Sequence, residues 1–74
     1  MAISGVVFVP ARGKTEALAA RLRAVPGVEV QGVGPGGVAA VMGAESPAGL
    51  RAMSEEMRAW DEVAGIHLAY LNWA

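Results

Sequence analysis

The residues of this chain that could do chemistry do not form a recognised catalytic or metal-binding pattern. Gly13-Lys14-Thr15 resembles the end of a phosphate-binding loop, but that motif requires a glycine where Phe8 stands. His67 is the single histidine and there is no cysteine, so a zinc site lacks ligands. Glu55 and Glu56 are adjacent on a predicted helix and diverge by about 100°, which does not suit an acid–base pair. We therefore predict no catalytic residue, no metal, no cofactor and no enzymatic activity.

A glycine-rich stretch at residues 32–37 has a superficial likeness to a dinucleotide-binding loop. Its glycine spacing does not match that motif, and it joins two predicted strands instead of a strand and a helix. We predict a hairpin turn in which Pro35 takes the second position and the glycine that follows it adopts a positive φ.

The composition restricts the class of protein. Of the 74 residues, 54% are hydrophobic and 18% are charged, which excludes a disordered tail and predicts one domain over residues 1–74. No apolar run approaches the roughly 20 residues of a membrane span, and no export signal is evident, so we expect no membrane insertion and a cytoplasmic location. The net charge of −1 argues against nucleic acid as a partner.

Charge is unevenly distributed along the chain. Residues 1–37 carry four basic and two acidic side chains, for +2, whereas residues 38–74 carry two basic and five acidic side chains, for −3. Two interpretations remain open: solvated helix faces, or an acidic patch that attracts a basic peptide. Arg51 with Glu55, and Arg58 with Glu62, have the spacing of ion pairs along a helix.

Hydrophobic periodicity predicts four strands and two helices. The strands are residues 3–9, 28–33, 38–42 and 66–73, and the helices are residues 14–25 and 46–61. Apolar stripes mark both helices: Leu18, Leu22 and Val25 on the first, and Leu50, Met53, Met57 and Trp60 on the second. Ser46 and Pro47 are suited to the cap and first position of the second helix.

This order of elements is β-α-β-β-α-β, and a weak internal repeat supports it. Arg23-Ala24-Val25 and Arg58-Ala59-Trp60 each precede a glycine and an alternating strand. We predict an α+β, ferredoxin-like sandwich, with two helices on one face of a four-stranded antiparallel sheet. Residues 3–9 are largely apolar on both sides and should be central, whereas residues 28–33 alternate and should form an edge.

The other face of such a sheet is uncovered. Apolar side chains there would need a lid, which could be a second copy, a peptide or a small ligand. If Val6 and Phe8 are core residues, the alternate side chains of the first strand lie on this open face.

Four segments of the chain match a known pattern: ISGVVFVPA, AVPGVEV, VAAVMGAES and the closing IHLAYLNW. In this order they resemble the NapD family, cytoplasmic assembly chaperones of the periplasmic nitrate reductase. The resemblance implies a ferredoxin-like fold without catalytic residues. It also implies binding of the twin-arginine signal peptide of the molybdenum-containing subunit, which delays export until the cofactor is inserted. Gly5 stands where the family typically has serine, and Gly43 where it often has an acidic residue, so the client could be another exported enzyme.

The predicted peptide-binding residues combine the open face with this resemblance. They are Ile3, Gly5, Val7, Val9, Glu29, Gln31, Val41 and Tyr70. Two interpretations of the last strand remain open. The internal repeat predicts that Ile66, Leu68 and Tyr70 face the core, whereas the family register could place them on the open face.

The main alternative is a small-molecule-sensing module of the ACT or Lrp effector class, which shares the element order and works as a homodimer. A further alternative, an enzyme of the dimeric α+β barrel kind, lacks the polar cluster that its site would need. A homodimer is therefore an option beside the peptide partner.

Overall fold

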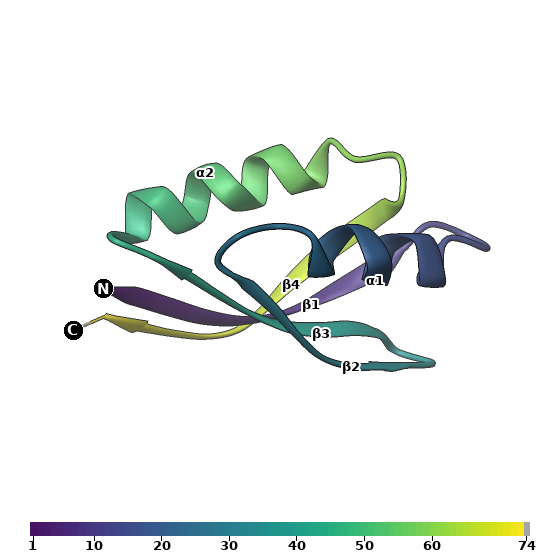
Figure 1. Ribbon diagram of the computed structural model, residues 1–74, viewed down its shortest axis with the longest axis horizontal. Coiled ribbons are helices and arrows are strands. Elements are labelled where there is room, and N and C mark those ends of the chain that lie inside the picture. Colours follow the sequence, from purple (N-terminus) through teal and green to yellow (C-terminus); the bar gives the residue numbers. More distant parts are fainter. Residues whose placement is uncertain (74) are drawn as a thin grey trace.

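The protein is described by a computed structural model that covers residues 1–73. Its elements are β1 (Ala2–Pro10), α1 (Thr15–Arg23), β2 (Val28–Gly34), β3 (Gly37–Ala44), α2 (Pro47–Arg58) and β4 (Val63–Trp73). The strands form one antiparallel sheet in the order β2-β3-β1-β4, and Figure 1 shows both helices on the same side of it. The predicted ferredoxin-like α+β fold is confirmed, with β1 central and β2 at an edge.

The core lies between the sheet and the helices. The largest fully buried side chains are Phe8, Leu18, Leu22, Met42 and Val38. Both predicted helix stripes contribute to it: Leu18 and Leu22 from α1, and Leu50 and Met57 from α2. Burying such side chains is the main favourable term for a domain of this size.

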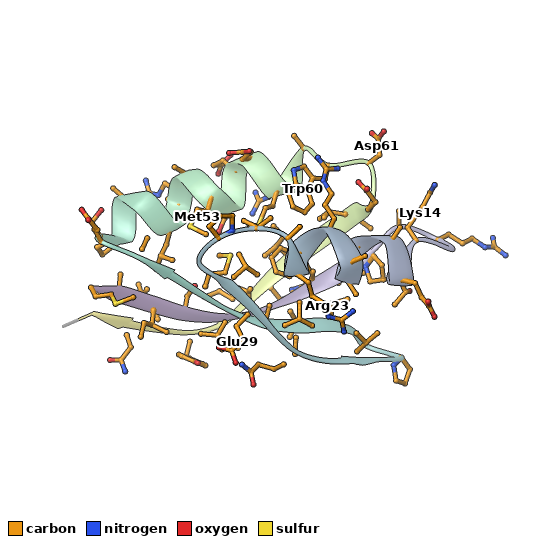
Figure 2. The ribbon with its side chains drawn as sticks, in the orientation of Figure 1. Lys14, Arg23, Glu29, Met53, Trp60 and Asp61 are labelled. Atoms are coloured by element: carbon orange, nitrogen blue, oxygen red, sulfur yellow. The ribbon has the colours of Figure 1, made fainter. Side chains whose placement is uncertain are left out.

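Two half-buried residues close the core between the helices. Met53 and Trp60 pack against the buried cluster, and Figure 2 shows Met53 directed from α2 toward the sheet. Trp60 lies two residues beyond the end of α2, where the Trp60 backbone N–H donates to the carbonyl of Met57 at 3.0 Å. The stripe predicted for this helix therefore continues past Arg58, the last residue of α2, into the hydrogen-bonded turn that follows it.

The ends of α2 have clear local causes. The Gly49 backbone N–H donates to Ser46 Oγ at 3.2 Å, and Pro47 occupies the first turn, as predicted. The helix ends at Arg58, three residues earlier than expected. β4 begins correspondingly early, because β1 extends to Pro10 and pairs there with Val63. Gly65, which lies just before the predicted strand of residues 66–73, is within β4 opposite Val9.

The hairpin between β2 and β3 forms as predicted, but its special backbone angle lies one residue later. Gly37 has a φ of 131°, and Gly36 has no positive φ. A Cβ at Gly37 would lie 2.4 Å from the carbonyl oxygen of Phe8, so a side chain there would clash with β1. Glycine is required at this position by both backbone angle and space.

Candidate functional site

One row of residues crosses the sheet face that the helices leave uncovered. Glu29 on β2 pairs with Val41 on β3, Val41 pairs with Gly5 on β1, and Gly5 pairs with Tyr70 on β4. Directly paired residues point to the same face of a sheet. The row therefore joins the four strands across the open face, with a carboxylate at one end and a phenol at the other.

The remaining predicted residues flank this row. Ile3, Val7 and Val9 alternate with the buried residues of β1, and Val7 pairs with Ala39 of β3. Gln31 lies at a bulge in β2, next to Glu29 on the same side. All eight residues predicted from the sequence thus lie on one face, although their contact with a peptide remains a prediction.

A bulge in β4 decides which of its side chains reach this face. The register passes from Gly5–Tyr70 to Val6–Leu68, so Ala69 is an extra residue without a partner in β1. Ile66 and Leu68 therefore face the helix side, while Tyr70 faces the open side. The interpretation from the internal repeat is right for Ile66 and Leu68, and the reversed interpretation is right for Tyr70.

Tyr70 lies directly on the backbone of β1. A Cβ built on Gly5 would be 2.1 Å from Tyr70 Cε2, so the ring occupies the space that any other residue at position 5 would need. Gly5 is buried although it is on the open face, and Tyr70 remains 50% exposed. Glycine at this position therefore has a structural cause: it leaves the space that the tyrosine ring occupies.

The face is gently hollowed on both sides of Val41. One depression of about 370 Å³ is lined by Ile3 and Glu29, and another of about 360 Å³ by Gln31 and Tyr70. The two share Val41, so they form a continuous surface along the strands.

Charge separates the two layers of the molecule. The six basic residues, Arg12, Lys14, Arg21, Arg23, Arg51 and Arg58, all lie in the helices or in the loop before α1. The acidic residues of the second half lie on α2 or in its flanking loops, so they do not form an acidic patch on the open face. Among the strand residues, Glu29 is the single carboxylate, and Figure 2 shows it on the side of the sheet away from Trp60 and Met53.

Comparison with known proteins agrees with this architecture. The sequence matches the family model described as NapD protein over residues 1–73. The chain belongs to the NapD family. Membership supports a general role in nitrate reductase assembly, in a family of chaperones and not of catalysts.

A solved structure with a different sequence has the same fold as this NapD-family chain. It is the crystal structure of the hypothetical protein PHS023 from Pyrococcus horikoshii, at a TM-score of 0.82 and 18% identity, covering 100% of this chain and 92% of that one. At this identity the likeness shows the fold alone. No match was found among curated proteins.

Two polar residues of the open face were not predicted. His67 pairs with Val7 and Asn72 pairs with Ile3, so both share the face of their partners. Strict alternation along β4 would place His67 and Tyr70 on opposite faces, and it would separate Asn72 from His67 in the same way. The sequence carries no signal for the bulge at Ala69 that brings all three together.

In this NapD-family chain, Glu62 forms an ion pair with Arg21 and not with Arg58, the partner predicted from the sequence. Arg21 Nη1 lies 2.8 Å from Glu62 Oε1, and the guanidinium stacks 3.9 Å from the centre of the Trp60 ring. Because α2 ends at Arg58, Glu62 is not on the helix and the predicted Arg58–Glu62 pair does not form. A hydrogen bond from the backbone at Glu62 lowers the pKa of this carboxyl, and the hydrogen bond and charge of Arg21 lower it further.

The described residues contain no group of three or more His, Asp or Glu side chains that could hold a metal ion. Residues 1–73 also contain no helix that is both long and apolar enough to cross a membrane. The open face offers apolar contact, the carboxylate of Glu29 and the hydrogen-bonding side chains of Gln31, His67, Tyr70 and Asn72.

Proposed function

We propose that this chain binds a twin-arginine signal peptide on the open face of its sheet. The client is an exported molybdenum enzyme of the periplasmic nitrate reductase type, and binding in the cytoplasm delays its export until maturation is complete. The observation that carries the proposal is the row Glu29–Val41–Gly5–Tyr70, an apolar surface with a carboxylate at one end. Family membership supports the assembly role within which this binding would operate.

The chemistry of the face suits a peptide that is both basic and apolar. A twin-arginine signal peptide has two arginines followed by a moderately apolar segment. The apolar segment would cover Ile3, Val7 and Val41, while one guanidinium pairs with Glu29 through charge-assisted hydrogen bonds. The Gln31 side-chain carbonyl and the Tyr70 hydroxyl are acceptors for the second arginine.

The absence of cations from the strands supports the same orientation. Since all six basic side chains lie in the helices or in the loop before α1, a basic peptide avoids like charges by approaching the open face. A free signal peptide is disordered and loses conformational entropy when it is bound. Part of the interaction free energy offsets that loss, so we expect a reversible complex that acts by sequestration and timing.

A calorimetric titration with a synthetic twin-arginine signal peptide tests the proposal. Glu29→Gln removes the charge and keeps the shape, and it should weaken binding by about tenfold, as for the loss of one charge-assisted hydrogen bond. Glu56→Gln is the matched control, because Glu56 is an exposed carboxylate on α2, in the helix layer. This control should bind like the wild type.

A second peptide with both arginines replaced by glutamine completes the design. The wild-type protein should bind it more weakly than the original, and Glu29→Gln should lose most of this preference. Equal affinity for the two peptides, or equal effects of Glu29→Gln and Glu56→Gln on affinity, would show that the open face does not recognise the arginine pair.

A further inference from the structure

A second apolar surface lies on the opposite side of the sheet, where α2 leaves the outer part of β4 uncovered. Leu68 is 64% exposed and Leu71 is 51% exposed, although both face the helix side. Together with Leu50 and Ile66 they line a groove of about 290 Å³ between α2 and β4. Exposed leucines that gather in a groove indicate a surface that meets a partner.

The backbone of β4 is also free along this groove. β4 is an edge strand of eleven residues and contains no Asp, Glu, Lys, Arg or Pro. The opposite edge, β2, is shorter, at seven residues, and carries Glu29. Edges are normally protected by charges, prolines, bulges or short length, and of these β4 has only two register irregularities, at Ala64 and at Ala69. A long, uncharged edge with exposed leucines is a template for strand pairing.

We propose that β4 pairs with β4 of a second copy of this chain. An antiparallel, two-fold arrangement merges the two sheets into one of eight strands, with all four helices on the same side. Leu68 is the middle residue of β4, so a pairing centred near it extends along the strand on both sides of the bulge at Ala69. The leucines of each protomer then enter the groove of the other.

The size of the surface fits this occupant. The molecule measures 36 × 20 × 19 Å, so its long side offers on the order of 700 Å². A stable interface of standard size uses about 600–1,000 Å² from each partner. The groove side is therefore large enough for a dimer if most of the β4 edge and the adjoining side of α2 take part.

The charges beside the groove fit a second copy as well. Arg51, Glu55 and Arg58 line its α2 side, so each protomer presents both signs there. In a two-fold dimer the two α2 helices run antiparallel across the axis, and Glu55 of one protomer is available to arginines of the other. β4 itself contains no Asp, Glu, Lys or Arg side chain, and its His67 lies on the open face, away from the groove.

Analytical ultracentrifugation over a range of protein concentrations tests the proposal. The wild type should sediment at twice the chain mass of 7.6 kDa at high concentration and dissociate on dilution. Leu68→Lys places a charge in the pairing edge and should raise the dimer dissociation constant by at least about tenfold. Val33→Lys is the matched control, because Val33 is a 47% exposed residue on the other edge strand. It should leave the dimer unchanged.

Two further measurements separate pairing from misfolding and from peptide binding. Circular dichroism should show the same secondary structure in Leu68→Lys as in the wild type, and Leu71→Glu should repeat its effect on the dimer. Hydrogen exchange should show β4 amides protected in the wild type at high concentration and exposed in Leu68→Lys. Both variants should keep wild-type affinity for the signal peptide, because Leu68 and Leu71 face away from the open face.

Three results would overturn the dimer. The first is a wild type that stays monomeric at all concentrations. The second is a dimer broken by Val33→Lys and not by Leu68→Lys, which would assign the interface to β2. The third is a monomer whose β4 amides become protected only when the signal peptide is added, which would assign this edge to the peptide.

Discussion

The contact between Gly5 and Tyr70 makes a strong prediction about stability. Replacing a glycine in a strand by alanine is ordinarily favourable, by roughly 0.5–1 kcal/mol, because glycine loses more backbone entropy on folding. At position 5 the added Cβ would lie 2.1 Å from Tyr70 Cε2, so the ring must leave its seat. We therefore expect Gly5→Ala to destabilise the protein.

The size of the effect follows from the exposure of the ring. Tyrosine buries roughly 200 Å² when it is covered completely. Because Tyr70 is 50% exposed, about 100 Å² is covered, which corresponds to at most about 2.5 kcal/mol at about 25 cal/mol per Å². The backbone gain of alanine offsets part of this, so the net loss should be about 1–2 kcal/mol.

Urea and thermal unfolding of four proteins measure this coupling: wild type, Gly5→Ala, Tyr70→Ala and the double variant. A loss of 1 kcal/mol should lower the melting temperature of a domain of this size by about 4–8 °C. Without the ring, Gly5→Ala should become neutral or stabilising. Gly34→Ala is the control, because a Cβ at Gly34 meets nothing within 4 Å and should cost little. The reasoning is refuted if Gly5→Ala has the same effect with and without the Tyr70 ring.

Two further variants test local features of the helix layer. Ser46→Ala removes the hydroxyl that accepts the backbone N–H at the start of α2, and chemical denaturation should show a loss of about 1 kcal/mol. Glu62→Gln tests the lowered pKa of Glu62 by urea unfolding at pH 7 and at pH 3. Since that pKa is lowered on folding, its stabilising effect is present above the ordinary value of 4.5 and is lost as pH falls through the lowered value. The variant should therefore be less stable than the wild type at pH 7 and approach it at pH 3, and a constant difference between the two proteins would contradict this cause.

The element order and the core could be predicted well from the sequence, because both depend on periodicity. A stripe such as Leu18 and Leu22 repeats with the helical turn, and Val6 and Phe8 alternate with the pleat of a strand. The central place of β1 followed from its apolar character on both faces. The boundaries were less accurate: α2 ends and β4 begins three residues early, since pairing between Pro10 and Val63 extends the sheet.

All eight predicted residues lie on the open face, but only some of these assignments follow from strict alternation along a regular strand. The alternating residues of β1, and Glu29 on β2, were assigned to the open face correctly, because each strand is regular there. The register of β4 could not be derived, since the bulge at Ala69 depends on how β4 meets β1 and not on its own residues. The partner of Glu62 could not be derived either, because Arg21 lies 41 positions away along the chain.

The sequence by itself determined which segments form strands and helices and which side of each segment is apolar, because these are local properties of residue type and spacing. Only the tertiary structure decided that Tyr70 lies on Gly5 and that Leu68 and Leu71 share a groove beside α2. The physical reason is that both depend on the bulge at Ala69 in β4, which changes the face to which the residues after it point. Packing between distant strands sets that position, and no local pattern in the sequence encodes it.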